Sequence, residues 1–204
     1  MAIISNHIDM KSIITLIFTL VVTIAFAQVK PDSSKHLSFK GVPIDGTLAE
    51  YVAKMKKGGF THKATKDGTA ILEGDFAAYK NCTVGVSTLK QKDLVSKIAV
   101  IFPECKTWSS LSSNYFNLKD LLIEKYGQPS ESVEDFQSYT PEDDGSKMTQ
   151  VELDACKYYT IFETEKGTIK LAIGHSDLTH CFVTLAYFDK INSETVKKQA
   201  LDDL

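Results

Sequence analysis

The chain has 204 residues and a formal net charge of -3, and 43% of its residues are hydrophobic, which is enough for a folded domain with an apolar core. All 23 basic residues are lysine. Arginine supplies the planar group that usually makes bidentate contacts with phosphates and base edges. Its absence argues against nucleic-acid recognition, so we expect a globular protein with another kind of partner.

The first 27 residues have the features of a signal peptide. Lys11 supplies a positive charge, Ile13–Ile24 form an apolar segment, and Ala25–Ala27 provide the small residues at which a signal peptidase cuts. Translation can start at Met1 or at Met10. Because the apolar segment is shorter than the roughly 20 residues that span a bilayer, we expect cleavage near Ala27. The product would be a periplasmic or secreted protein without a transmembrane segment.

Two segments of the mature chain have the pattern of amphipathic helices. In the first, Thr47 and Glu50 form a capping box ahead of an apolar stripe, and the helix ends at Gly58. The second covers Trp108–Tyr126 and ends before Gly127. Its apolar stripe recurs at the helical period and consists of Leu111, Tyr115, Leu118 and Leu122.

Strand-like segments follow each helix. The first helix is followed by Thr69–Ala77, Cys82–Leu89 and Val95–Phe102. The second is followed by the segment Glu131–Ser138, a long acidic loop, and then Lys157–Glu163, Thr168–His175 and Cys181–Phe188. Because short polar turns join them and parallel strands need long crossovers, we expect antiparallel pairing.

These elements predict an α+β fold made of two tandem units, residues 39–105 and 106–204. Each unit is expected to hold one helix and its own antiparallel β-meander of three to four strands. Residues 28–38 are polar and are expected to form a flexible lead-in. A short C-terminal helix is expected to begin at Ser193.

This arrangement resembles the β-lactamase inhibitor protein fold and its relatives among small outer-membrane assembly lipoproteins. The matching segments are Tyr51–Phe60 with Cys82–Phe102, and Leu118–Pro129 with Lys157–Phe188. The phrases FKGVPIDGTL, EKYGQP and ALDDL also resemble a family of uncharacterised secreted proteins of anaerobic gut bacteria. Neither resemblance supplies a catalytic residue.

The mature chain contains four cysteines, and two interpretations of them stay open. In an exported protein an even number indicates disulfides, and Cys82 with Cys105 and Cys156 with Cys181 is the simplest pairing. Alternatively, the alternation of Cys82 and Cys181 with neighbouring apolar residues is typical of buried thiols.

A cluster of metal-ligand residue types occurs near the end of the predicted strands. His175, Asp177 and His180 lie close together in the sequence and, with Cys181, offer ligands suited to zinc or copper. Their spacing matches no standard metal motif, and His175 is in phase with Ile173, which is typical of a histidine at the edge of the core. His180 and Cys181 are adjacent in a strand and point to opposite faces, so we expect no histidine-activated thiol.

Charge is distributed unevenly. Between Lys30 and Lys66 there are eight lysines and three acids, a balance of +5, whereas between Glu131 and Asp154 there are eight acids and one lysine, a balance of -7. Such poles can steer association with a charged partner, or they can face each other within the fold.

No catalytic signature emerges from the sequence. It contains no G-x-S-x-G, no H-E-x-x-H and no glycine-rich phosphate loop. We therefore expect an exported, non-enzymatic protein without a cofactor, which binds a protein or a component of the cell envelope through an extended sheet surface. The alternatives are a metal-dependent hydrolase using His175, Asp177 and His180, and a protein that binds a small apolar ligand between helix and sheet.

Overall fold

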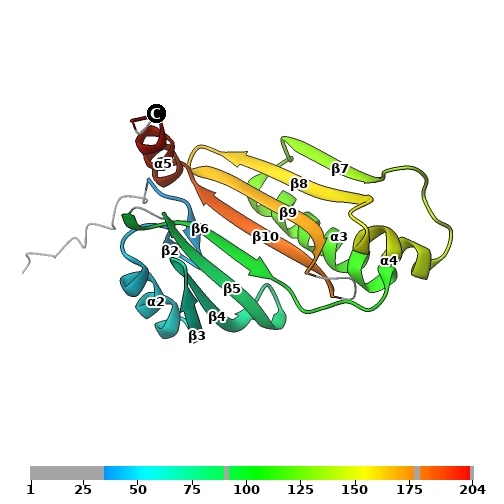
Figure 1. Ribbon diagram of the computed structural model, residues 1–204, viewed down its shortest axis with the longest axis horizontal. Helices are drawn as coiled ribbons and strands as arrows, with labels where there is room; N and C mark the ends of the chain where they lie inside the picture. The colour runs from blue at the N-terminus through cyan, green and yellow to red at the C-terminus, as the bar shows by residue number, and fades with distance from the viewer. Residues whose placement is uncertain (1–34, 90–91, 177–179, 203–204) are drawn as a thin grey trace, which may run out of the picture. The chain divides into compact units, whose positions relative to one another are not determined.

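The computed structural model describes residues 35–89, 92–176 and 180–202 (Figure 1). The predicted signal peptide and Asp177 lie outside these residues. Within the described ranges no helix is both long enough and apolar enough to cross a membrane.

The first half of the chain contains three kinds of element. Two short strands form a sheet of their own, β1 (Ser38–Phe39) and β2 (Val42–Pro43). The helix α2 (Leu48–Lys57) follows. Four longer strands come next: β3 (Thr61–Lys66), β4 (Thr69–Phe76), β5 (Tyr79–Leu89) and β6 (Lys92–Ile101).

The second half repeats the order of one helix and four strands, with two additional helices. Its strands are β7 (Glu131–Phe136), β8 (Cys156–Thr164), β9 (Gly167–His175) and β10 (Cys181–Asp189). Its helices are α3 (Trp108–Tyr126), α4 (Asp144–Glu152) and α5 (Lys190–Asp202).

All eight longer strands belong to one antiparallel sheet in the order β3-β4-β5-β6-β10-β9-β8-β7. The antiparallel prediction is confirmed, but the predicted α+β fold with two separate sheets of three to four strands is wrong: the chain is mostly β and its sheet is continuous. The two halves join where β6 pairs with β10, from Lys97 opposite Phe188 to Ile101 opposite Thr184. Both strands carry buried apolar residues, and separate sheets would leave their inner edges with unpaired backbone groups.

Both predicted helices are confirmed at their capped ends. Thr47 and Glu50 form the reciprocal capping box of α2, and the Thr107 side chain caps α3 by accepting from the Ser110 N–H. The buried residues of α3 include its predicted stripe, Leu111, Tyr115, Leu118 and Leu122.

Two elements were not predicted. The strand β3 has no predicted counterpart, because its sequence THKATK carries no apolar alternation. All six of its residues are exposed. The helix α4 was expected to be part of an acidic loop. It begins where the Asp143 carboxylate accepts from the Ser146 N–H at 2.8 Å, and it buries only Met148 and Val151.

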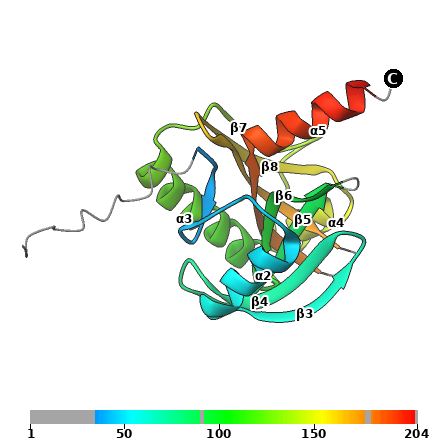
Figure 2. The ribbon, with the colours of Figure 1, turned by 90° about the vertical axis from the view of Figure 1, so that its left-hand side faces the viewer.

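The helices α2 and α3 cover the same face of the sheet, and one contiguous core lies beneath them (Figure 1). Side chains alternate between the two faces of each strand. In β10, for example, every second residue from Cys181 to Asp189 is buried, and the residues between them are partly exposed. Among the described residues, no helix lies along the other face of the sheet, and α5 projects beyond one end of the strands (Figure 2).

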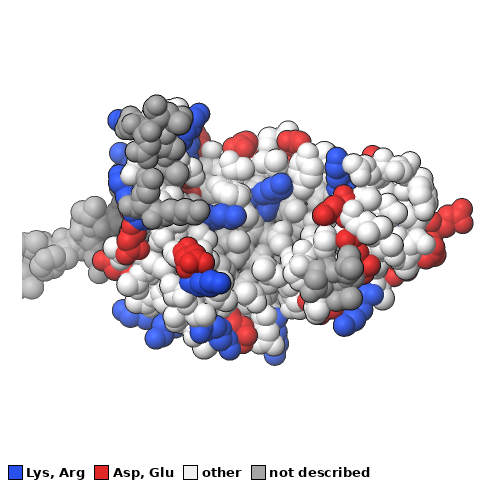
Figure 3. All heavy atoms as spheres, in the orientation of Figure 1, with Lys and Arg blue, Asp and Glu red and all other residues white. Residues whose placement is uncertain are grey.

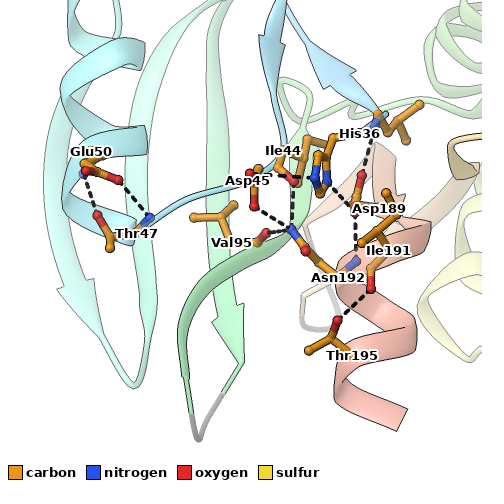
Figure 4. A network of polar contacts seen from close by, with 11 residues as sticks. His36, Ile44, Asp45, Thr47, Glu50, Val95, Asp189, Ile191, Asn192 and Thr195 are labelled. Atoms are coloured by element: carbon orange, nitrogen blue, oxygen red, sulfur yellow. Dashed lines mark hydrogen bonds and ion pairs between the residues drawn. The ribbon is translucent and has the colours of Figure 1, made fainter. Parts of the chain in front are cut away.

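A buried polar network joins the first described residues to the end of β10 (Figure 4). The Asp189 carboxylate is completely buried and accepts from the N–H of Leu37 at 2.8 Å and of Asn192 at 2.9 Å. The ring Nδ1 of His36 lies 3.0 Å from it. The side-chain amide of Asn192 donates in turn to the carbonyl oxygens of Ile44 and Val95. This network fixes the position at which α5 leaves the sheet.

Candidate binding surface

The face of the sheet opposite α2 and α3 is called the open face here. Residues paired across antiparallel strands share a face, so the register defines its rows. One row consists of Glu73, Thr83, Ile101, Thr184, Ala172, Tyr159 and Val133. The next consists of Ile71, Gly85, Ala99, Ala186, Lys170, Ile161 and Glu131.

Small residues occupy the centre of the open face. Gly85, Ala99 and Ala186 lie side by side on β5, β6 and β10, where the two halves of the sheet join. A Cβ atom added to Gly85 would come no closer than 3.8 Å to any neighbour, so packing within the chain does not require glycine at this position. Small residues in a strand allow another backbone to approach closely.

Larger apolar residues surround this centre. Ile101, the last residue of β6, is 38% exposed. Its row continues to Tyr159 and Val133, and the neighbouring row contains Ile71 and Ile161. In the same orientation as Figure 1, the space-filling view shows a largely uncharged surface over these strands (Figure 3).

Two lysines on the open face are held over aromatic rings. The Nζ of Lys97 lies 5.0 Å from the ring centre of Phe188, and that of Lys170 lies 4.9 Å from the ring centre of Tyr159. Cation–π contacts of this kind hold the stem of the lysine along the apolar surface while its charged end stays in water. The open face therefore combines an apolar centre with two positioned positive charges.

The helix α5 forms a wall at one end of the open face. A groove of about 440 Å³ lies between the helix and the strand ends, and Phe188 forms part of its floor. The sheet side also contributes Glu163 and Thr168, and the helix contributes Ser193 and Lys197.

A larger groove of about 1100 Å³ lies beside α2. The helix lines it with Leu48, Ala49 and Val52, and β3 lines the opposite side with His62 and Thr65. Two carboxylates at its rim, Asp67 and Asp93, make it polar at one end, and Asp93 also accepts from the N–H of Leu48 at the start of the helix.

The two predicted histidine ligands contact different carboxylates among the described residues. His175, at the end of β9, lies 3.1 Å from a carboxylate oxygen of Asp154, whereas His180 lies 3.9 Å from Glu104. Among the described residues, no group of three or more His, Cys, Asp or Glu is placed to hold a metal ion. Asp177 lies outside the described residues, so the three-residue site stays a prediction.

All four cysteines are free thiols, so no disulfide is present. Cys105 and Cys181 are opposite each other in an isolated antiparallel bridge, and thus the thiols that are backbone neighbours come from different halves of the chain. The Cys105 sulfur accepts from the Asn114 side chain at 3.2 Å. Burial raises the pKa of the Cys156 thiol to about 12. Burial also raises the pKa of Cys82 and Cys105, and a raised pKa disfavours the nucleophilic thiolate.

Comparison of the chain with protein-family models, curated proteins and solved structures finds no match.

The sequence predicts most of the strands but not which residues of different strands lie side by side. Val95–Phe102 was predicted as a strand, yet nothing in that segment shows that Ala99 lies between Gly85 and Ala186. Cross-strand register brings these residues together, and register depends on the pairing of β6 with β10.

Proposed function

We propose that the chain is an exported, non-enzymatic binding protein that holds a protein partner against the open face of its sheet. The observation that carries this proposal is the combination of small residues at the centre, at Gly85, Ala99 and Ala186, with no helix of the described chain lying along that face.

The chemistry of the open face favours a protein partner. The cores of protein interfaces are apolar, and they are surrounded by polar rims. Here Ile101, Ile71 and Ile161 surround the small residues, and charged residues such as Glu73 and Glu131 lie at the outer ends of the rows. Lys97 and Lys170 would favour a partner with carboxylates at matching positions, because such complementarity fixes orientation and raises the association rate.

The experiment compares two substitutions that add the same charge on opposite sides of the chain. Ala99→Glu places a carboxylate at the centre of the open face, and Ser113→Glu places one on the exposed side of α3. Each tagged protein is purified from the cells that express it, and bound proteins are quantified by mass spectrometry. We expect a defined partner with the wild type and with Ser113→Glu, and recovery at least about tenfold lower with Ala99→Glu.

Equal recovery with both variants would contradict the proposal. Recovery of envelope lipid or polysaccharide instead of protein, lost with Ala99→Glu, would move the assignment to an envelope component.

A second candidate is the binding of a small apolar ligand in the groove beside α2. Its volume of about 1100 Å³ is at the upper end of the range for small-molecule sites, and Leu48, Ala49 and Val52 make one wall apolar. Native mass spectrometry of the gently purified protein would show an added mass that Val52→Trp removes. The absence of any added mass in the wild type would exclude a retained ligand.

A further inference from the structure

The two edge strands of the sheet carry opposite charges. The strand β3, THKATK, contains His62, Lys63 and Lys66, and all of its residues are exposed. The strand β7, ESVEDF, contains Glu131, Glu134 and Asp135. Each has six residues, and the described sheet has no further strand outside either of them. The basic and acidic poles of the sequence are therefore placed at opposite edges of one sheet.

The strand count makes these edges geometrically compatible. In an eight-stranded sheet with only antiparallel neighbours, the first and last strands run in opposite directions. When a second copy in the same orientation is placed beside the first, β7 of one copy meets β3 of the next as an antiparallel pair. The helices of both copies then lie on the same side of the extended sheet, and the open faces are continuous.

The side chains match in the register that places Lys66 opposite Glu131. Thr65 then lies opposite Ser132 and Ala64 opposite Val133, and the match ends there because the register of β3 shifts between His62 and Ala64. The matched side chains also lie on the same face of the sheet. Lys66 and Ala64 are paired with Thr69 and Ile71 of the open face. Glu131 and Val133 are paired with Ile161 and Tyr159 of that face. Opposite charges placed directly across a strand pair stabilise it.

Pairing between identical edges is disfavoured by the same charges. Two β3 strands would bring lysines together, and two β7 strands would bring carboxylates together, which destabilises strand pairs. The edges therefore select a head-to-tail contact, which is heterologous and produces rings or filaments rather than two-fold dimers.

The contacts that these residues make within one copy do not prevent the contact between two copies. Lys63 pairs with Glu73 at 3.2 Å, and both side chains are more than 40% exposed. The Glu131 carboxylate accepts from the Tyr159 hydroxyl, and Glu134 pairs with Lys119. Exposed ion pairs such as Lys63–Glu73 contribute about 1 kcal/mol or less, so a second charge can share Lys63 without loss of the fold. Glu134 faces α3 and keeps its partner Lys119.

We infer that copies of this chain associate head to tail, with β3 of one copy adding to β7 of the next through main-chain hydrogen bonds and the Lys66–Glu131 pair. This inference does not depend on the proposed function, since the open face stays uncovered in the assembly.

Charge reversal provides the test. Lys63→Glu with Lys66→Glu makes both edges acidic, and Glu131→Lys with Glu134→Lys makes both edges basic. Sedimentation velocity at low ionic strength is expected to show oligomers of the wild type that grow with protein concentration and dissociate in high salt. Each double variant alone is expected to be monomeric.

The decisive experiment mixes the two double variants. A basic β3 then meets an acidic β7, and an acidic β3 meets a basic β7, so oligomers are expected to return and to contain both variants in alternation. Circular dichroism and thermal unfolding confirm that each variant is folded before mixing. A wild type that stays monomeric at millimolar concentration and low salt would overturn the inference. Oligomers that persist in either double variant alone, or fail to return in the mixture, would also overturn it.

Discussion

The same strands make both faces of the eight-stranded sheet, yet packing within the chain constrains the side chains of one face more than those of the other. On the helix-covered face, large side chains such as Phe162, Leu171 and Leu185 fill the space beneath α3. On the open face the central residues are Gly85, Ala99 and Ala186, and a Cβ atom added to Gly85 would come no closer than 3.8 Å to a neighbour. Packing within the described chain therefore constrains Gly85 little, and for this reason we propose the open face as the binding surface.

The largest expected effect is a difference in the free energy of unfolding between substitutions at two neighbouring residues of β8. Phe162 is buried, so Phe162→Ala should lower the free energy of unfolding by about 3–5 kcal/mol through loss of burial and creation of a cavity. Ile161, which points to the open face, is the matched control, and Ile161→Ala should cost less than about 1.5 kcal/mol. Urea unfolding measures both. Equal losses would show that the open face is also packed.

The next effect concerns the buried network at the end of β10. Asp189→Ala removes the acceptor for the N–H groups of Leu37 and Asn192 and leaves both buried, which should cost about 2–4 kcal/mol. Asp45→Ala is the control, because that side chain is 46% exposed and lies at the edge of the network. Thermal unfolding distinguishes the two. A small loss for Asp189→Ala would mean that water replaces the carboxylate.

Alkaline pH should weaken the helix-covered face before it affects the open face. Burial raises the pKa of Tyr115 to about 12, and its hydroxyl lies 2.5 Å from the Thr160 hydroxyl. Because the folded pKa lies above the unfolded value of about 10, the stability from this group is complete below pH 10 and is lost as the pH rises toward 12.

Tyr115→Phe should therefore be less stable than the wild type by about 1 kcal/mol at pH 7, because the Thr160 hydroxyl loses its partner. Its stability should also fall less steeply above pH 10. Unfolding curves measured from pH 7 to pH 11 check both statements. Parallel curves for the two proteins would show that Tyr115 titrates normally.

The smallest expected effect on stability is on the open face. Ala99→Glu adds a charge to a partly exposed position, and such surface changes usually alter the free energy of unfolding by no more than about 0.5 kcal/mol. A loss of several kcal/mol, measured by urea unfolding, would place Ala99 in a packed environment and remove the contrast between the faces.

The parts of the fold that sequence predicted are those with local signals. The capping box at Thr47 and the apolar stripe of α3 are patterns that lie within a few helical turns of sequence. The strand β3 has no such signal, because Thr61–Lys66 are exposed on both faces and only their pairing with β4 makes them a strand. The junction of β6 with β10 joins residues more than 80 positions apart, and no local pattern specifies it.

The candidate surface could not be predicted from the sequence for the same reason. Ala99 and Ala186 are ordinary strand residues in the sequence, and their significance arises only when register places them beside Gly85. His175 and His180 were predicted as metal ligands from their residue types. The carboxylates that they contact, Asp154 and Glu104, lie on separate segments.

Site-specific photo-crosslinking tests the central claim most directly. A photoreactive phenylalanine analogue is placed at Ile101, which lies beside the small residues of the open face, or at Leu121, which is 54% exposed on α3. Both are introduced into the chain in the cells that express it. We predict one defined crosslinked protein from position 101 that disappears when Ala99→Glu is added, and none from position 121. Crosslinks from position 121 alone, or no crosslink from position 101, would contradict the assignment of the open face as the binding surface.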